Sequence, residues 1–216
     1  MRIGVLGTGM VGRTIAGRLV DVGHEVKLGS RTADNQSAAE WVEAVGAGAS
    51  QGTFADAAAF GELVFNCTSG DASIEALRAS GADNLAGKVV VDVSNALDFS
   101  EGRPPSLFLT SKESLGERIQ AAFPDARVVK TLNTVNNEVM VDPAKVPGEH
   151  DVFLSGDDDE AKETVRGVLE SFGWPTESIV DLGDITTARG PEQYLPLWLR
   201  FWGVVGHGRF NIKLVR

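Results

Sequence analysis

Apolar and amphipathic segments alternate along most of this chain. The runs RIGVLG, ELVFNCTS, KVVVDVSN and ARVVKTLNT are rich in apolar and β-branched residues, which is typical of strands buried on both faces. Stretches between them, such as MVGRTIAGRLVDVG, place apolar residues at helical spacing. Because the alternation continues to about residue 182, the pattern predicts an α/β fold of the Rossmann type, with a doubly wound, mainly parallel sheet.

Later segments extend this pattern. SLGERIQAAFP predicts a helix that begins with a capping box formed by Ser114 and Glu117. HDVFLSG predicts a further strand. DDDEAKETVRGVLESFG predicts a helix whose aspartates suit its N-terminus and whose end is Gly173.

The residues after position 182 have a different character. They are rich in aromatic side chains and contain Pro191 and Pro196, which interrupt regular helices. We expect a Rossmann domain over residues 1–182. A small helical C-terminal segment, residues 183–216, is expected to pack on the same domain and to cover the substrate cleft.

Composition narrows the class of protein. The chain has 216 residues, a net charge of −10 and one cysteine. The negative charge argues against nucleic acids and anionic membranes as partners. No apolar run is long enough to span a membrane, and the N-terminus enters a strand without a signal peptide. Since the lone Cys67 excludes an intrachain disulfide, a cytoplasmic protein is the simplest expectation.

The segment GTGMVG follows the first strand and opens the first helix. Its glycines have the spacing of a dinucleotide-binding turn, in which they permit a tight turn, close approach of a pyrophosphate, and close packing of helix and strand. Backbone amides at the helix N-terminus then face the phosphates. The candidate cofactor-binding residues here are Gly7, Thr8, Gly9, Met10, Val11 and Gly12. The alternative is a glycine-rich turn without a ligand.

The end of the second strand indicates which dinucleotide is bound. An acidic residue at this position would select NAD, but the chain has Ser30 and Arg31. A hydroxyl and a guanidinium group suit the 2′-phosphate of NADP. The sequence therefore favours NADP(H) as cofactor, with an ordinary solvated turn as the alternative.

Small polar residues follow the later strands, where ligands of such sheets bind. We expect the nicotinamide half of NADP(H) to contact Cys67, Thr68, Ser94 and Asn95. Asn133 and Thr134 are expected to position the reacting rings. Ordinary turn chemistry explains the same residue types equally well.

No catalytic acid or base is assigned. No histidine, lysine or carboxylate is predicted at the strand ends, so catalysis is expected to work by positioning alone. His150 is expected to face solvent, which leaves His207 as the histidine nearest to a candidate pocket. The sequence shows no metal-ligand spacing, and no metal site is predicted.

With these motifs in place, the chain resembles the family of NADP oxidoreductases that depend on the deazaflavin coenzyme F-420. The similarity runs nearly end to end, through MRIGVLGTGMVGRTIAGRL, HEVKLGSR, VVVDVSNAL, VVKTLNTV, FLSGDDDEAKETV and FNIKLVR. Its most specific parts are GSR after the second strand and the asparagine of KTLNT.

The resemblance implies that Thr8, Ser30 and Arg31 contact NADP. Archaeal members often carry a further basic residue where this chain has Asn35, so part of the phosphate clamp is missing or replaced. The family's deazaflavin lies against the nicotinamide in a cleft closed by the C-terminal segment. The substrate-binding residues implied in this way are Asn133, Thr134, Trp198, Trp202 and His207.

The leading hypothesis is hydride transfer between NADPH and coenzyme F-420. Reduction of another acceptor, such as a flavin, a quinone or ferric iron, is one alternative, and a catalytically silent NADP sensor is another. Imine and β-hydroxyacid reductases add a large helical domain, for which too little chain follows residue 182. The resemblance and the aromatic C-terminal segment also favour a homodimer.

Overall fold

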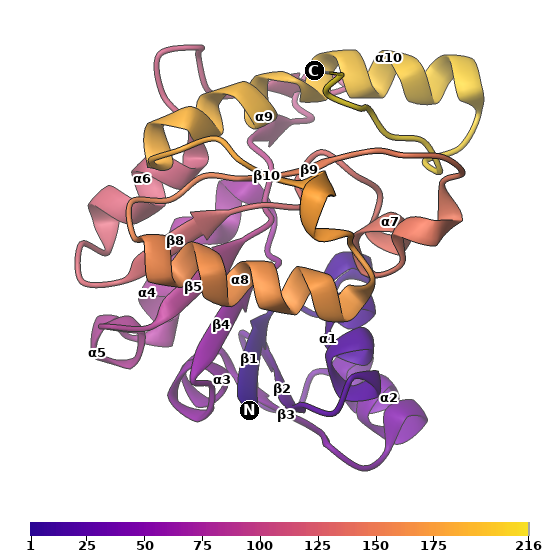
Figure 1. Cartoon of the computed structure of the whole chain (residues 1–216). Helices are drawn as coiled ribbons and strands as arrows, with labels where there is room; N and C mark the ends of the chain where they lie inside the picture. Colours follow the sequence, from indigo (N-terminus) through magenta and orange to yellow (C-terminus); the bar gives the residue numbers. More distant parts are fainter. Residues whose placement is uncertain (216) are drawn as a thin grey trace.

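The computed structural model describes residues 1–215, and its centre is a six-stranded sheet in which all neighbouring strands run parallel (Figure 1). In spatial order the strands are β3 (Ala49–Thr53), β2 (Glu25–Ser30), β1 (Arg2–Leu6), β4 (Leu63–Asn66), β5 (Val89–Asp92) and β8 (Arg127–Lys130). The strand order changes direction between β1 and β4, as in a doubly wound Rossmann sheet. The predicted fold class is confirmed.

Helices cover both faces of this sheet. One face packs against α1 (Met10–Asp21), α2 (Gln36–Val45), α7 (Asn137–Val141) and α8 (Asp159–Phe172). The other packs against α3 (Phe54–Phe60), α4 (Ser73–Ser80), α5 (Ala82–Leu85) and α6 (Leu115–Ala122). Neighbouring residues of a strand enter opposite cores, as Val5 and Leu6 do in β1. Because both faces are buried, the strands read as continuous apolar runs.

Two helix ends have the predicted geometry. Ser114 caps α6 and forms the reciprocal capping box with Glu117. α8 ends at Gly173, whose φ of 104° lies in the left-handed region that favours glycine. The short 3₁₀ turns between elements are Gly70–Ala72, Pro143–Lys145, Thr176–Ser178 and Ile185–Ala188.

The segment HDVFLSG forms the predicted strand, but this strand lies outside the main sheet. Its strand, β9 (Val152–Leu154), does not continue the main sheet but pairs in parallel with β10 (Ile179–Asp181). A single antiparallel bridge between Lys130 and Ser155 joins this small sheet to the end of β8. A three-residue strand that meets β8 in the opposite direction cannot extend a parallel ladder. A second two-stranded sheet is the antiparallel pair β6 (Leu97–Asp98) and β7 (Ser106–Leu107).

The C-terminal segment forms α9 (Arg189–Gln193) and α10 (Leu195–Val205), which lie beyond one end of the sheet (Figure 1). The chain then runs back, and the Asp151 amide donates to the carbonyl of Ile212 over 2.9 Å. His150 is buried here, because Asn211 and Trp174 cover its ring, so the expectation that it faces solvent is wrong. No helix within residues 1–215 is long and apolar enough to cross a membrane.

Candidate functional site

The turn after β1 is shaped by glycine. Gly7 has a φ of 111°, and its amide donates to the carbonyl of Gly29 over 2.9 Å. A Cβ on Gly7 would lie 2.7 Å from the Cys67 carbonyl oxygen, and a Cβ on Gly12 would lie 1.9 Å from the Gly7 carbonyl oxygen. Both positions therefore require glycine for the turn, the strand and α1 to pack together.

Gly9 differs from the other two glycines of the turn. It precedes α1, and a Cβ there would meet no atom within 4 Å. Within residues 1–215 no side chain caps this end of α1, so the first amides of the helix, including those of Met10 and Val11, have no capping side chain. Open space bounded by free amides at a helix N-terminus fits the pyrophosphate of a dinucleotide.

At the end of β2, Ser30 and Arg31 have different surroundings. Ser30 is buried, and its hydroxyl donates to the carbonyl of Thr32. Arg31 is exposed and makes no ion pair within residues 1–215. Asn35 caps α2, because its side chain accepts from the Ala38 amide over 3.0 Å. Within residues 1–215 Arg31 is thus an exposed cation without an ion-pair partner, whereas the Asn35 side chain caps α2.

The residues after β4 form a local polar turn. Thr68 donates its hydroxyl to the side-chain oxygen of Asn66 over 2.6 Å, which fixes its position beside the glycine turn. Burial, together with the negative charge of Asp92, raises the pKa of the Cys67 thiol. A thiol that stays protonated is a weak nucleophile, so Cys67 is suited to packing and contact rather than to covalent chemistry.

Two asparagines join the ends of β5 and β8. The side chain of Asn133 donates to the side-chain oxygen of Asn95 over 3.1 Å, and Asn95 donates to the Asn133 carbonyl over 3.0 Å. Leu132, immediately before, has a φ of 60°, a left-handed conformation that costs a leucine roughly 1–3 kcal/mol. Thr134 is buried in the same turn. The reciprocal hydrogen bonds therefore help to hold this turn in its conformation against the strain at Leu132.

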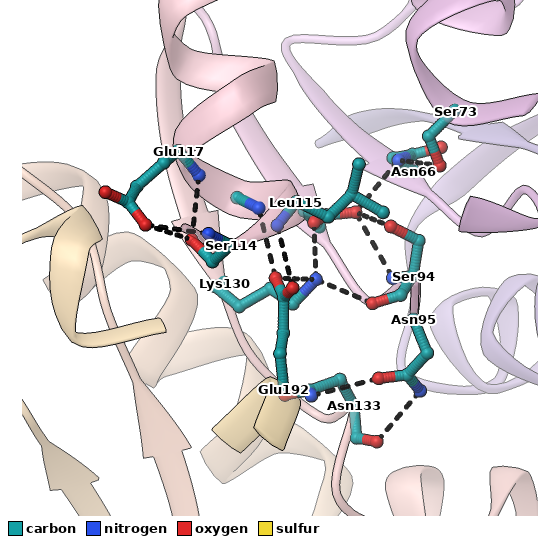
Figure 2. Close-up of polar contacts among 12 residues, drawn as sticks. Asn66, Ser73, Ser94, Asn95, Ser114, Leu115, Glu117, Lys130, Asn133 and Glu192 are labelled. Atoms are coloured by element: carbon teal, nitrogen blue, oxygen red, sulfur yellow. Dashed lines mark hydrogen bonds and ion pairs between the residues drawn. The ribbon is translucent and has the colours of Figure 1, made fainter. Parts of the chain in front are cut away.

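Next to these asparagines lies a buried ion cluster, which consists of Asp92, Lys130 and Glu192. Figure 2 shows Lys130 and Glu192 beside Asn95 and Asn133. The Lys130 ammonium contacts the Asp92 carboxylate at 2.7 Å and the Glu192 carboxylate at 2.9 Å, and it donates to the Ser94 carbonyl over 2.6 Å. Burial opposes its charged form, but the two carboxylates more than offset burial and raise the pKa of Lys130. Lys130 is therefore a cation in the folded protein.

Glu192 belongs to the C-terminal segment and connects it to the start of α6. Its carboxylate accepts from the amides of Leu115 and Gly116 over 2.7 and 3.1 Å. The neighbouring Arg189 pairs with Glu117 on the same helix. The negative carboxylate of Glu192 at a helix N-terminus is electrostatically favourable.

The ion cluster shows that the prediction of no lysine or carboxylate at the strand ends is wrong. Asp92 and Lys130 are the last residues of β5 and β8. A sequence signal existed for both, because a charged residue that ends a fully apolar strand is buried and needs a partner. Glu192 lies in a polar part of the C-terminal segment, and nothing in its surroundings distinguishes it.

A hollow of about 440 Å³ connects the glycine turn with the C-terminal segment. Met10 from the start of α1 and Trp202 and His207 from the C-terminal segment line it. Its remaining lining residues are Asn136, Asn137, Glu138, Gly206, Gly208 and Arg209. The hollow is large enough for a planar ring system, and it opens beside the start of α1.

Most of the predicted site residues thus fall into three groups. The glycine turn, Ser30 and Arg31 border the open N-terminus of α1. Asn95 and Asn133 pair above the ion cluster, with Thr134 buried next to them. Met10, Trp202 and His207 line the hollow, whereas Trp198 is buried against Trp202 and Phe210 with ring centroids 5.1 and 5.2 Å apart.

Comparisons with known proteins point in one direction. Residues 2–96 match the protein family described as NADP oxidoreductase, coenzyme F-420-dependent. A crystal structure from Arthrobacter sp. FB24, provisionally described as an F-420-dependent NADP reductase, is 51% identical in sequence. The two chains cover each other over 100% of their lengths with a TM-score of 0.94.

More distant similarities also concern reductases. Metalloreductase STEAP3 of Rattus norvegicus is 29% identical over 201 residues, or 91% of this chain, and the chain spans 38% of the length of that protein. A reductive aminase from Aspergillus terreus, solved with NADPH and ethyl levulinate, is 22% identical with a TM-score of 0.67. The similarity covers 95% of this chain and 62% of the aminase, and it concerns the fold alone.

Proposed function

The chain belongs to the family of coenzyme F-420-dependent NADP oxidoreductases, and from that premise we propose that it transfers a hydride between NADPH and a deazaflavin of the F-420 type. NADP-linked oxidoreduction is the class of reaction that family membership supports. The deazaflavin is the finer part of the proposal. It rests on the family description and on the hollow beside the glycine turn.

One observation carries the cofactor assignment. The open N-terminus of α1 lies at the carboxyl edge of the sheet that also carries Arg31, an exposed arginine at the end of β2. The free amides suit a pyrophosphate, and a guanidinium group suits a 2′-phosphate. The bound NADPH supplies the hydride.

The remaining residues act by positioning. Asn95 and Asn133 form a rigid pair of amides at the strand ends, where a nicotinamide and its carboxamide would be held. Met10 and Trp202 offer apolar surface on two sides of the hollow, which keeps water from a planar acceptor. Hydride transfer between two stacked rings needs alignment and exclusion of water more than an acid or base.

The metalloreductase similarity favours a second candidate. Rat STEAP3 matches 91% of this chain, so an acceptor from another class, such as a flavin or a ferric complex, is the alternative. Because the chain spans only 38% of that protein, the activity of the whole metalloreductase is not transferred to it.

An acceptor screen tests the proposal. NADPH is mixed with the protein and with F-420, a flavin, a quinone or a ferric chelate, and loss of the reduced-cofactor absorbance is followed. We expect the fastest turnover with F-420. Faster turnover with a flavin or a ferric chelate would contradict the deazaflavin assignment, and tight NADPH binding without turnover on any acceptor would favour a sensor.

We also propose that the protein is a homodimer. The exposed apolar side chains of α10 are Leu197, Phe201, Trp202, Val204 and Val205. An apolar patch of this kind is commonly covered by another protein surface. Sedimentation at micromolar concentration should give a dimer, and Val204→Glu should give a monomer. A monomeric wild-type protein would contradict the proposal.

A further inference from the structure

The ion cluster carries an excess negative charge. Asp92 accepts from Asn66, Ser94 and Lys130, and Glu192 accepts from two backbone amides and Lys130. Apart from the Ser94 hydroxyl, which can also accept, all of these partners are obligate donors, and such a set suits two carboxylates. With Lys130 as the single cation, the cluster has a net charge of minus one.

This charge is held away from water. Asp92, Lys130 and Glu192 are 0%, 1% and 2% exposed. The N-terminus of α6 offsets part of the Glu192 charge, since a helix end acts as roughly half a positive charge. Removal of the Glu192 charge would nevertheless change the net charge of the cluster by one full unit. Buried charges are screened far less by salt than charges at the surface.

The cluster lies at one particular half of the candidate dinucleotide site. Arg31 and the end of β2 lie on one side of the glycine turn, where the 2′-phosphate and adenosine would bind. Asp92 and Lys130 end β5 and β8, on the other side of that turn. The nicotinamide half of the dinucleotide therefore faces the strand ends that carry the cluster.

The cluster is also in contact with the residues expected to hold the ring. Lys130 donates to the carbonyl of Ser94, and the next residue, Asn95, is paired with Asn133 (Figure 2). Ser94 thus links the charged cluster to the strand-end asparagines.

We propose that Glu192 favours the oxidised cofactor by making this cluster negative. The inference rests on the proposed function. The nicotinamide ring is neutral in NADPH and positive in NADP⁺, because the hydride leaves its C4 carbon with two electrons. The hydride forms a new C–H bond on the ring acceptor, and solvent supplies the accompanying proton. A nearby negative charge stabilises the positive ring and so promotes hydride donation. Glu192 acts at a distance and touches no reacting atom.

The expected size of the effect follows from Coulomb's law. Two unit charges about 10 Å apart at an effective dielectric constant of about 20 interact strongly enough to change a binding constant about ten-fold. We therefore expect Glu192→Gln to weaken binding of NADP⁺ about ten-fold relative to binding of NADPH. Glutamine keeps the size of the side chain and an acceptor for Lys130.

The test measures dissociation constants by calorimetry for three ligands: NADP⁺, NADPH and 2′-phospho-ADP-ribose, which lacks the nicotinamide. Glu117→Gln is the matched control, because it removes a carboxylate from the same helix N-terminus but one that Arg189 neutralises. We expect Glu117→Gln to leave the ratio of NADP⁺ affinity to NADPH affinity unchanged. We also expect Glu192→Gln to leave the affinity for 2′-phospho-ADP-ribose unchanged. Asp92→Asn removes the other negative charge of the cluster, should shift the ratio in the same direction, and serves if Glu192→Gln does not fold.

Equal weakening of all three ligands in folded Glu192→Gln would assign Glu192 a purely structural role and overturn the inference. An unchanged ratio of NADP⁺ to NADPH affinity would overturn it as well. If the wild-type protein bound none of the three ligands, the proposed function would itself be wrong, and the inference would fall with it.

Discussion

The two halves of the candidate site differ in whether backbone groups or buried side chains form most of them. On the glycine-turn side, backbone amides and the open space next to Gly9 form the start of the site, and the Arg31 side chain stands at its edge. On the side of β5 and β8, buried charged side chains and paired asparagines fill the space. The first half is suited to an anionic group such as a phosphate. The second is suited to a ring that is held by packing and by the electric field of the buried charges.

The two halves are therefore sensitive to different substitutions. The glycine turn depends on distances between backbone atoms, so an added methyl group is enough to disturb it. The ion cluster depends on complete pairing, because a buried charge without a partner is costly. Five substitutions test this contrast.

Lys130→Met should have the largest effect. It leaves Asp92 and Glu192 buried without a cation, and breaking a buried pair in this way costs about 3–5 kcal/mol. Chemical denaturation should show this loss in the free energy of unfolding. Wild-type stability in this variant would mean that the carboxylates are protonated or reach solvent, and the contrast would fail.

Gly12→Ala and Gly9→Ala should separate folding from binding. The Cβ at position 12 would lie 1.9 Å from a carbonyl oxygen, so thermal unfolding should occur at a lower temperature, and NADPH affinity should fall at least about 100-fold. The Cβ at position 9 meets nothing, so the melting temperature should stay near the wild-type value while NADPH affinity falls. If Gly9→Ala bound NADPH normally, the pyrophosphate site would lie elsewhere.

Arg31→Ala should weaken NADPH and spare NADH. A charge-assisted hydrogen bond contributes about 1.5–3 kcal/mol, which corresponds to roughly ten- to a hundredfold in affinity. Binding titrations with both cofactors provide the measurement. Equal losses for NADPH and NADH would show that Arg31 does not read the 2′-phosphate.

Glu117→Gln should have the smallest effect and should depend on pH. The hydrogen bond from Arg189 lowers the pKa of Glu117, so its contribution is present above the ordinary value of 4.5 and is lost as pH falls through the lower folded-state value. For a partly exposed pair we expect about 0.2–1 kcal/mol at pH 7, vanishing in acid. Melting curves from pH 7 to 3 should converge for the two proteins, and a constant gap would exclude this linkage.

The local parts of the molecule could be predicted from the sequence. Strand, turn and helix follow one another within residues 2–21, and the glycine spacing carries its own geometric meaning. The capping box of α6 likewise involves residues three positions apart. Periodicity and spacing report on neighbours along the chain, and these features need nothing else.

The long-range parts could not be predicted in the same way. Glu192 reaches the Leu115 amide across 77 positions, and no spacing rule covers such a contact. β9 pairs with β10 rather than with the main sheet, and the two strands are separated in sequence by the whole of α8. The left-handed backbone of Leu132 violates the local preference of leucine, so a sequence pattern points away from it.

The reach of Glu192 also sets an order of events during synthesis. Lys130, Asp92 and the first amides of α6 leave the ribosome well before the carboxylate that pairs with them. Until residue 192 emerges, the glycine-turn half can assemble from contacts already made, while the other half lacks one of its charges. The nascent chain therefore completes its cofactor edge last, when the C-terminal segment docks.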